Sequence, residues 1–147
     1  MIAEQVGSGQ PQRIFLVTAH LDSTSETAYR NTLAPGADDN ASGSAAVMAL
    51  ADILSQYHFN CTLRYVLFTG EEQGLRGSVA YANDIVALGE NLQGVLNLDM
   101  VGYNTPGTAS TIELHTQVGN GGTAIATLFA DAVEAYNIDL TPQIIPN

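Results

Sequence analysis

The chain has 147 residues, 46% of them hydrophobic, and fifteen Asp and Glu stand against four Lys and Arg. A chain of this length can form one domain that buries roughly 70% of its extended surface. The formal net charge of −11 at pH 7 repels phosphate backbones, so nucleic-acid binding is excluded as a main function and cationic ligands are favoured.

Neither a membrane-spanning protein nor a disulfide-stabilised protein is expected. No apolar run approaches the roughly 20 residues that a membrane-spanning helix needs, and no leader of the signal-peptide type is recognisable in these residues. The single cysteine, Cys61, excludes an internal disulfide and a cysteine-rich metal cluster.

The first part of the chain predicts two strands and a helix. Residues 2–6 predict a short strand with a Gly/Pro turn after it, and residues 13–19 (RIFLVTA) predict a buried strand. Residues 41–57 predict a helix, because Val47 and Leu54 fall at helical spacing with other apolar residues between them.

The pattern of strands and helices continues to the end of the sequence. Residues 64–69 (RYVLFT) and 95–99 (VLNLD) predict two more buried strands, with a helix over residues 75–88 between them. Residues 110–115 predict a weaker strand and residues 123–136 a third helix.

This alternation predicts a single α/β domain over residues 1–147, with a sheet that is mainly parallel. The first two buried strands are almost continuously apolar, as expected for strands with both sheet faces covered by helices. Two adjacent isoleucines at 144–145 indicate that a further strand begins close to the end of the sequence.

Metal-binding residue types follow each of the three buried strands. His20 and Asp22 follow the first, Glu71 and Glu72 follow the second, and Asp99 ends the third. Ligands of open α/β sheets bind beyond the carboxyl ends of the strands, so we expect these side chains to meet at one edge of the sheet.

A loop with two further acids, Asp38 and Asp39, opens the first helix and should lie near the same edge. Each feature alone has a simpler explanation: acids favour the start of a helix and serve as helix caps. Together, several carboxylates in one cleft repel one another unless cations are present.

The basic residues are too few and too distant to neutralise this cluster. Arg13 and Arg64 begin predicted strands at the far end of the sheet, Arg30 lies in a loop, and Arg76 alone is close in sequence. A divalent metal is therefore predicted, and one histidine with several carboxylates suits zinc, or less selectively manganese or cobalt.

Asp22 is predicted to act behind the metal ligands. A ligating imidazole usually donates its second N–H to a carboxylate, which fixes the tautomer and orientation of the ring. The spacing His20-x-Asp22 suits this role.

These residues resemble the co-catalytic zinc aminopeptidases of the bacterial leucyl aminopeptidase type, with their glutamate carboxypeptidase-like relatives. The resemblance covers nearly the whole chain, in the order and spacing of its motifs. The matching motifs are TAHLDS (18–23), PGADDNASG (35–43), FTGEEQGLRGS (68–78) and NLDM (97–100). The resemblance implies a three-layer αβα sandwich with a mixed, mainly parallel sheet.

The resemblance also implies roles for the site residues. The implied metal ligands are His20, Asp39, Glu72 and Asp99. Asp39 would bridge two zinc ions, Glu72 would bind the second of them, and Asp38 would be a neighbour of the bridge. Glu71 would be the general base and Asp22 the residue that orients the histidine.

One expected ligand is missing. The family completes the second zinc with a histidine well beyond the position of Asp99, and the sequence after Asp99 contains only His115. His58 is expected at the opposite end of the sheet. We therefore expect a domain that is incomplete at its C-terminus, with an incomplete second zinc site and an open sheet edge through which copies could associate.

The implied function is zinc-dependent hydrolysis of the N-terminal peptide bond of peptides, through a water between two metals. Alternatives are a non-catalytic relative that acts as a binding domain and a single-zinc acyltransferase of the glutaminyl cyclase kind. A calcium module is disfavoured because EF-hand spacing is absent. Aminopeptidase and carboxypeptidase action are not separated by the sequence, and the resemblance implies a secreted or periplasmic parent protein.

Overall fold

The computed structural model describes residues 1–25, 35–117 and 121–146, so Arg30 lies outside the described part. The chain divides into two compact units, Met1–Gly102 and Tyr103–Asn147. The prediction of a single domain over residues 1–147 stays a prediction. No helix in the described residues is long and apolar enough to cross a membrane.

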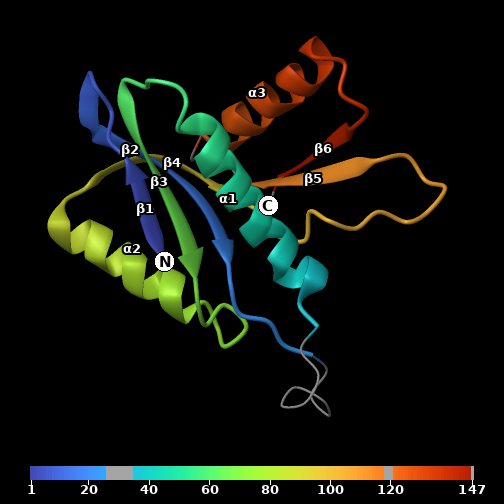
Figure 1. Cartoon of the computed structure of the whole chain (residues 1–147), viewed down its shortest axis with the longest axis horizontal. Helices are drawn as coiled ribbons and strands as arrows, with labels where there is room; N and C mark the ends of the chain where they lie inside the picture. Colours follow the sequence, from blue (N-terminus) through green and yellow to red (C-terminus); the bar gives the residue numbers. More distant parts are fainter. Residues whose placement is uncertain (26–34, 118–120, 147) are drawn as a thin grey trace. The chain divides into compact units, whose positions relative to one another are not determined.

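The first unit is built on a four-stranded mixed sheet (Figure 1). The strands are β1 (Ile2–Gln5), β2 (Gln10–His20), β3 (Cys61–Phe68) and β4 (Asn91–Asn97). Their order is β1-β3-β2-β4, with β2 parallel to both β3 and β4 and β1 antiparallel to β3. The predicted mixed, mainly parallel α/β arrangement is confirmed for this unit.

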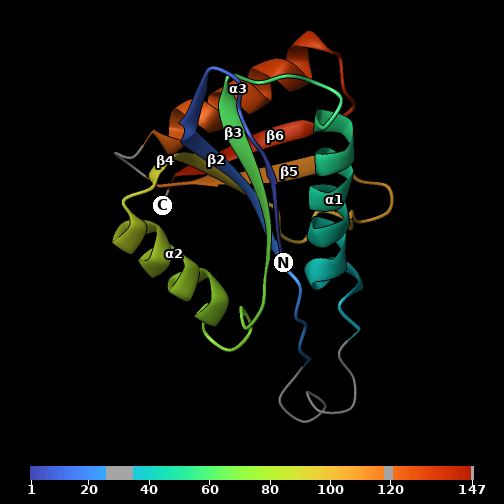
Figure 2. The ribbon, with the colours of Figure 1, turned by 60° about the vertical axis from the view of Figure 1, so that its left-hand side comes forward.

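Two helices cover opposite faces of this sheet, which gives the predicted three layers (Figure 2). They are α1 (Gly43–Leu54) and α2 (Arg76–Leu88). A π-helical turn over Ala37–Ser42 leads into α1, so the regular helix is shorter at both ends than the predicted 41–57.

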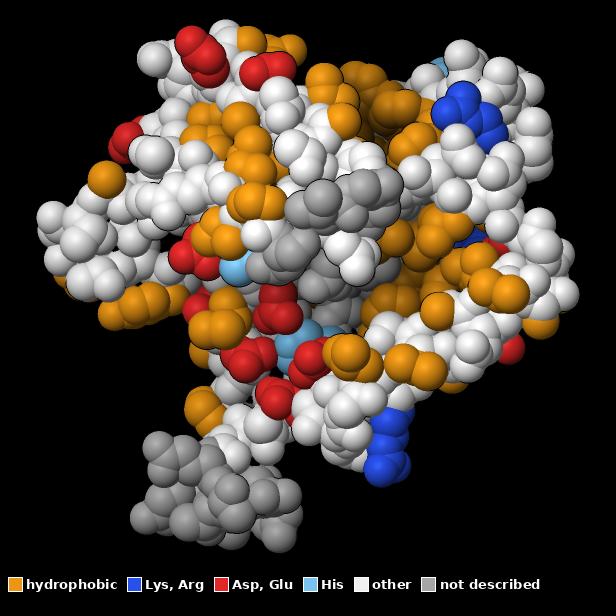
Figure 3. Space-filling view, turned by 180° about the vertical axis from the view of Figure 1, so that it is seen from behind, with side chains coloured by type: hydrophobic (Ala, Val, Ile, Leu, Met, Phe, Trp, Pro, Cys, Tyr) orange, Lys and Arg blue, Asp and Glu red, His pale blue; other side chains and the backbone are white. Residues whose placement is uncertain are grey.

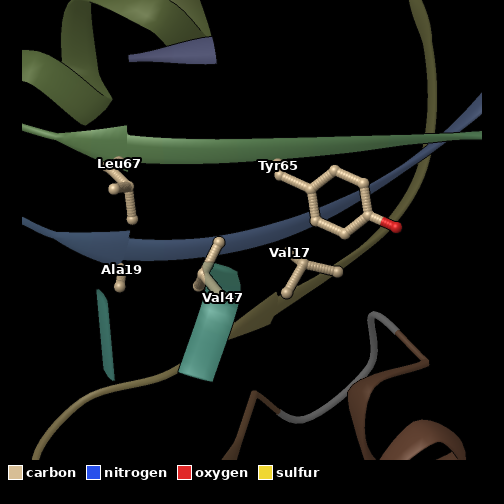
Figure 4. Close-up of a cluster of buried hydrophobic side chains, with 5 residues drawn as sticks. All are labelled: Val17, Ala19, Val47, Tyr65 and Leu67. Atoms are coloured by element: carbon tan, nitrogen blue, oxygen red, sulfur yellow. The ribbon is translucent and has the colours of Figure 1, made fainter. Parts of the chain in front are cut away.

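The two faces of β2 and β3 carry separate apolar clusters. Val47 of α1 packs against Val17, Ala19, Tyr65 and Leu67, as Figure 4 shows. On the other face, Ile85 of α2 packs in a cluster whose remaining buried members are Ile14, Leu16 and Val66. Because successive side chains of a strand alternate between faces, a strand that is apolar throughout can fill both clusters.

The third predicted strand is shifted toward the N-terminus. The prediction was 95–99, whereas β4 covers Asn91–Asn97. The start of β4 is polar because it lies at the edge of the sheet, with Asn91 and Gln93 exposed, so apolar patterning does not mark it. The chain leaves the sheet after Asn97, and this departure frees Asp99 to reach the site.

The second unit is a separate strand–helix–strand element. Its parallel strands β5 (Thr111–Thr116) and β6 (Thr141–Pro146) are joined by α3 (Gly122–Ala135). These elements match the predictions for residues 110–115, 123–136 and 144–145 to within a few residues. Ala126 and Val133 are the buried residues of α3.

Candidate metal centre

His20 lies at the end of β2 with its ring directed at two carboxylates. Its Nε2 is 3.0 Å from Oδ1 of Asp39 and 3.5 Å from Oδ1 of Asp99. The three residues each offer a ligand atom, and these atoms lie within 4.8 Å of one another. The His20 side chain is 4% exposed, whereas those of Asp39 and Asp99 are 46% and 42% exposed.

The sheet topology explains this convergence. β2 and β4 are parallel neighbours, so their carboxyl ends lie at the same edge, and Asp99 follows β4 by two residues. Asp39 lies in the turn before α1, whose Ser44 Oγ donates a hydrogen bond of 2.9 Å to the carbonyl of His20. The edge predicted from the sequence is therefore where these three side chains meet.

Asp22 contacts both His20 and the Glu71–Glu72 turn, through different atoms. His20 Nδ1 is 2.9 Å from the carbonyl oxygen of Asp22, while the nearer carboxylate oxygen is 3.8 Å away. That carboxylate instead accepts the backbone N–H groups of Glu71 and Glu72, each at 3.2 Å. In this structure the carbonyl oxygen of Asp22, rather than its carboxylate, lies nearer to His20 Nδ1, and the predicted role of the Asp22 carboxylate toward the ring stays a prediction.

Glu71 and Glu72 lie in the turn between β3 and α2. Glu72 Oε1 accepts a hydrogen bond of 3.2 Å from the backbone N–H of Thr24. Removal from water, together with the negative charges of Asp39 and Glu71, raises the pKa of Glu72 above its ordinary value. Glu72 therefore lies within electrostatic reach of Asp39, although it is not part of the three-residue group around His20.

Negative charges of the acids also raise the pKa of His20, here by favouring its charged form. Burial lowers its pKa, but the hydrogen bond to the Asp22 carbonyl and the charges of Asp99, Glu71 and Asp39 outweigh that effect. The pKa of His20 is consequently raised above 6.5. A cation, whether a proton or a metal, is therefore stabilised at this position.

The arginines in the described part of the chain do not neutralise the cluster. Arg64 forms its ion pairs with Glu4 and Glu90, at 2.6 Å each, and Arg13 hydrogen-bonds Gln93 and Gln10. Among the residues that the structure describes, no arginine forms an ion pair with the acids around His20. Figure 3 shows acidic side chains gathered around a histidine on one face of the molecule.

The donor set fits zinc. One imidazole nitrogen and two carboxylate oxygens lie within 4.8 Å of one another. Zinc binds His nitrogen and Asp or Glu oxygen, and its catalytic sites use three protein ligands. The close approach of uncompensated carboxylates is an observation that a divalent cation would explain.

A pocket of about 250 Å³ adjoins these residues. His20, Glu71 and Asp99 line it, together with three apolar and three uncharged polar residues. The other lining residues are Thr18, Phe68, Leu75, Ser78, Val95 and Asn97. The acids therefore face a cavity in which a small apolar group could lie.

The other two histidines are not part of this cluster. His58 is exposed between α1 and β3, and the adjoining Phe59 carbonyl bonds the turn that leads into β2, at the opposite end of the sheet as predicted. His115 lies in the second unit, with Nε2 2.9 Å from Glu113 Oε2. Within the described ranges, His20 is the one histidine in the group of metal-ligating side chains.

Comparison with known proteins identifies the family. The model of peptidase family M28 matches residues 1–147. The chain belongs to peptidase family M28. The predicted resemblance to zinc aminopeptidases is thereby confirmed at the level of the family.

Curated relatives of this M28 chain include fungal proteins. It is 38% identical over 106 residues to a "Probable zinc metalloprotease" of Pyrenophora tritici-repentis, covering 71% of this chain and 22% of that protein. A protein of the same name from Pyricularia oryzae is 36% identical over 117 residues, covering 79% and 23%. The chain thus spans about a quarter of the length of these relatives.

Solved structures of similar proteins share the fold. A zinc aminopeptidase from Bacillus subtilis superposes with a TM-score of 0.75 at 28% identity, covering 95% of this chain and 33% of that one. An aminopeptidase from an Aneurinibacillus strain gives 0.70 at 27% identity, covering 98% and 33%. A glutaminyl cyclase from an Acidobacteriales bacterium gives 0.74 at 14% identity, covering 98% and 50%, a likeness of fold alone.

Proposed function

We propose that this M28 chain carries the catalytic centre of a zinc-dependent aminopeptidase that removes the N-terminal residue of peptides. The observation that carries the proposal is the convergence of His20 Nε2 with the carboxylates of Asp39 and Asp99 within 4.8 Å. The relatives are named zinc metalloproteases and a structural neighbour is a zinc aminopeptidase, which supports the choice of metal and reaction.

The proposed ligands divide between two zinc ions. His20 and Asp99 would hold one ion, Glu72 would hold the other, and Asp39 would be shared between them. When bound, such ions supply Lewis acidity, which lowers the pKa of water and polarises a peptide carbonyl.

Glu71 is proposed as the general base. It lines the pocket beside His20 and Asp99, where its carboxylate can take a proton from the attacking water and return it to the leaving amine. The Asp22 carboxylate holds the backbone of Glu71 and Glu72, and the Asp22 carbonyl holds the ring of His20. Asp22 therefore orients both the base and a metal ligand.

The test combines zinc content with hydrolysis of leucyl and methionyl chromogenic amides. We expect bound zinc and measurable hydrolysis, and we expect Glu71→Gln to keep zinc while the rate falls by about 10²- to 10⁴-fold. Glu134→Gln, an exposed acid of α3, is the matched control and should leave the rate unchanged.

Other outcomes of the same test separate the alternatives. Zinc binding without hydrolysis in either the wild type or Glu71→Gln would favour a non-catalytic binding domain. Cyclisation of a peptide with N-terminal Gln, without amide hydrolysis, would favour an acyltransferase. Absence of zinc from the folded wild type would refute the proposal.

A further inference from the structure

Asn40, the residue after Asp39, forms hydrogen bonds with the backbone of the segment that carries Asp99. Asn40 is buried, with 2% of its surface exposed. Its Nδ2 donates a hydrogen bond of 3.0 Å to the carbonyl of Leu98, and its Oδ1 accepts a longer one of 3.4 Å from the N–H of Met100. One amide side chain thus contacts the backbone on both sides of Asp99.

Asp38, the residue before Asp39, forms a second hydrogen-bonded link to the segment that carries Asp99. Asp38 Oδ1 accepts a hydrogen bond of 2.8 Å from the N–H of Gly102. Ser42 Oγ lies 2.7 Å from the Asp38 carbonyl oxygen and 3.1 Å from its Oδ1, and donates its proton to Asp38. Ser42 Oγ in turn accepts the N–H of Val101 at 3.0 Å. Both neighbours of Asp39 are therefore tied to the chain around Asp99.

The start of α1 packs closely against the Asn40 side chain and the Leu98 carbonyl. Asn40 Oδ1 also accepts the N–H of Gly43 at 3.0 Å. A Cβ atom at residue 43 would collide with Asn40 Oδ1 and with the Leu98 carbonyl. Gly43 has an ordinary helical φ of −63°, so the close approach is what requires glycine there.

Apart from their shared contact with His20 Nε2, the two carboxylates have little to fix their separation. The side chains of Asp39 and Asp99 are about half exposed, at 46% and 42%, so packing does not hold them. They also repel each other, and a residue in the turn before α1 must be kept near a residue after β4. Besides His20, the hydrogen bonds made by their buried or partly buried neighbours oppose this repulsion.

We infer that Asn40, and Asp38 together with Ser42, are positioning residues that set the distance between Asp39 and Asp99, and through it the affinity of the metal site. This inference rests on the proposed zinc centre. Partners behind metal ligands typically change metal affinity or activity by about 10- to 100-fold when they are replaced.

A merely structural role makes a different prediction. Asn40 also satisfies backbone groups at the start of α1, so its loss is expected to destabilise the fold in either case. A positioning role requires in addition that the folded variant binds zinc more weakly. Zinc affinity and the stability of the metal-free protein must therefore be measured separately.

The experiment compares Asn40→Ala and Ser42→Ala with Thr62→Val as a matched control. Thr62 is 2% exposed and, like Asn40, joins distant backbone, with Oγ1 donating to the Pro11 carbonyl and accepting the N–H of Gly7. It lies near the start of β3, at the end of the sheet opposite to the site. Zinc affinity is measured by competition with a chromogenic chelator, and stability by urea unfolding without metal.

We expect Asn40→Ala to weaken zinc binding by about 10- to 100-fold and to alter the absorption spectrum of bound cobalt. Thr62→Val should lose stability and keep its zinc affinity. Equal zinc affinity of Asn40→Ala and the wild type would overturn the inference while leaving the zinc centre intact. If Asn40→Ala does not fold, Ser42→Ala decides the question, and a zinc affinity of Ser42→Ala equal to that of the wild type overturns the inference. Absence of zinc binding in the wild type would instead refute the proposed zinc centre.

Discussion

At the residue scale, the site combines a buried ring with exposed acids. His20 is held from three sides, by the Asp22 carbonyl at Nδ1, by Ser44 at its own carbonyl, and by its place in β2. Asp39 and Asp99 depend on their neighbours for position. A site built this way has one fixed nitrogen ligand and acids whose placement is set by the backbone.

The raised pKa of His20 predicts how zinc binding depends on pH. A ligating histidine must lose its proton, and the pKa of His20 in the metal-free fold lies above 6.5. Its protonation therefore stabilises the metal-free fold at low pH, and this contribution is lost as the pH rises through the folded pKa. We expect zinc affinity to increase as the pH is raised above 6.5, with proton release on binding, as measured by calorimetry in buffers of different ionisation enthalpy. Affinity that is constant from pH 6 to 8 would contradict the role of His20 as a ligand.

Asp22 offers a second test at this scale. Asp22→Ala removes the carboxylate that accepts the N–H groups of Glu71 and Glu72 but keeps the backbone carbonyl that bonds His20. The base should lose its orientation while the histidine keeps its own. We therefore expect kcat to fall by about 10- to 100-fold with a smaller change in zinc affinity. An equal loss of both would indicate that the carboxylate acts mainly on His20, as the sequence had suggested.

At the element scale, the layered core holds the strand ends in register. Val47 is 2% exposed and lies between the side chains of β2 and β3 (Figure 4). Val47→Ala should lower the free energy of unfolding by about 1.5–3 kcal/mol, from lost burial and the cavity left behind. Met48, its neighbour on α1, is 63% exposed, so Met48→Ala should change stability by less than about 0.5 kcal/mol. Equal effects of the two substitutions would mean that α1 does not pack as described.

A network around Arg64 joins three elements of the first unit and the residue before β4. Arg64, in β3, bonds Glu4 of β1, Tyr81 of α2 and Glu90 just before β4. Its hydrogen bonds to Glu90 lower the pKa of that carboxyl below 4.5 and outweigh the opposing effect of burial. The network is remote from the metal centre and is a source of stability rather than of catalysis.

This network makes stability depend on pH in the acid range. Because the folded pKa of Glu90 is lowered, its contribution is complete above 4.5 and is lost as the pH falls through the lower folded value. Glu90→Gln should cost about 1–3 kcal/mol at neutral pH, and urea unfolding should show this difference shrinking as the pH falls below 4.5. A difference that stays constant into the acid range would show that the charge of Glu90 is not what Arg64 requires.

Features of the fold and of the site that depend on residue type and periodicity could be predicted from the sequence. The ends of β2 and β3 carry chemically distinctive residues after apolar runs, so His20 and Glu71 could be assigned to one edge of the sheet. Asn40 could not be assigned, because its partners are backbone groups of residues distant in sequence and its amide has no charge that requires compensation. The polar start of β4 was missed for a related reason: an edge strand does not need the apolar pattern of a central one.

At the scale of the whole molecule, the two units differ in their buried cores and in which of them holds the candidate metal centre. The formal net charge of −11 favours bound cations, and the candidate centre lies entirely in the first unit. Self-association through an open sheet edge stays a prediction. In the described part of the second unit, the buried residues are Thr116, Ala126 and Val133, which is a small core for independent stability.

This difference predicts separate responses to zinc. Ligand at 100 times its Kd stabilises a folded unit by about 2.7 kcal/mol, and the ligands His20, Asp39 and Asp99 all belong to the first unit. Hydrogen exchange followed by mass spectrometry should therefore show zinc-dependent protection of β2, β4 and the start of α1, while β5, α3 and β6 exchange faster and without change. His20→Ala, which removes the nitrogen ligand, should abolish the protection and leave exchange in α3 as it was. Protection by zinc that is centred on His115 and Glu113 instead would place the metal in the second unit and contradict the assignment of the centre to the ends of β2 and β4.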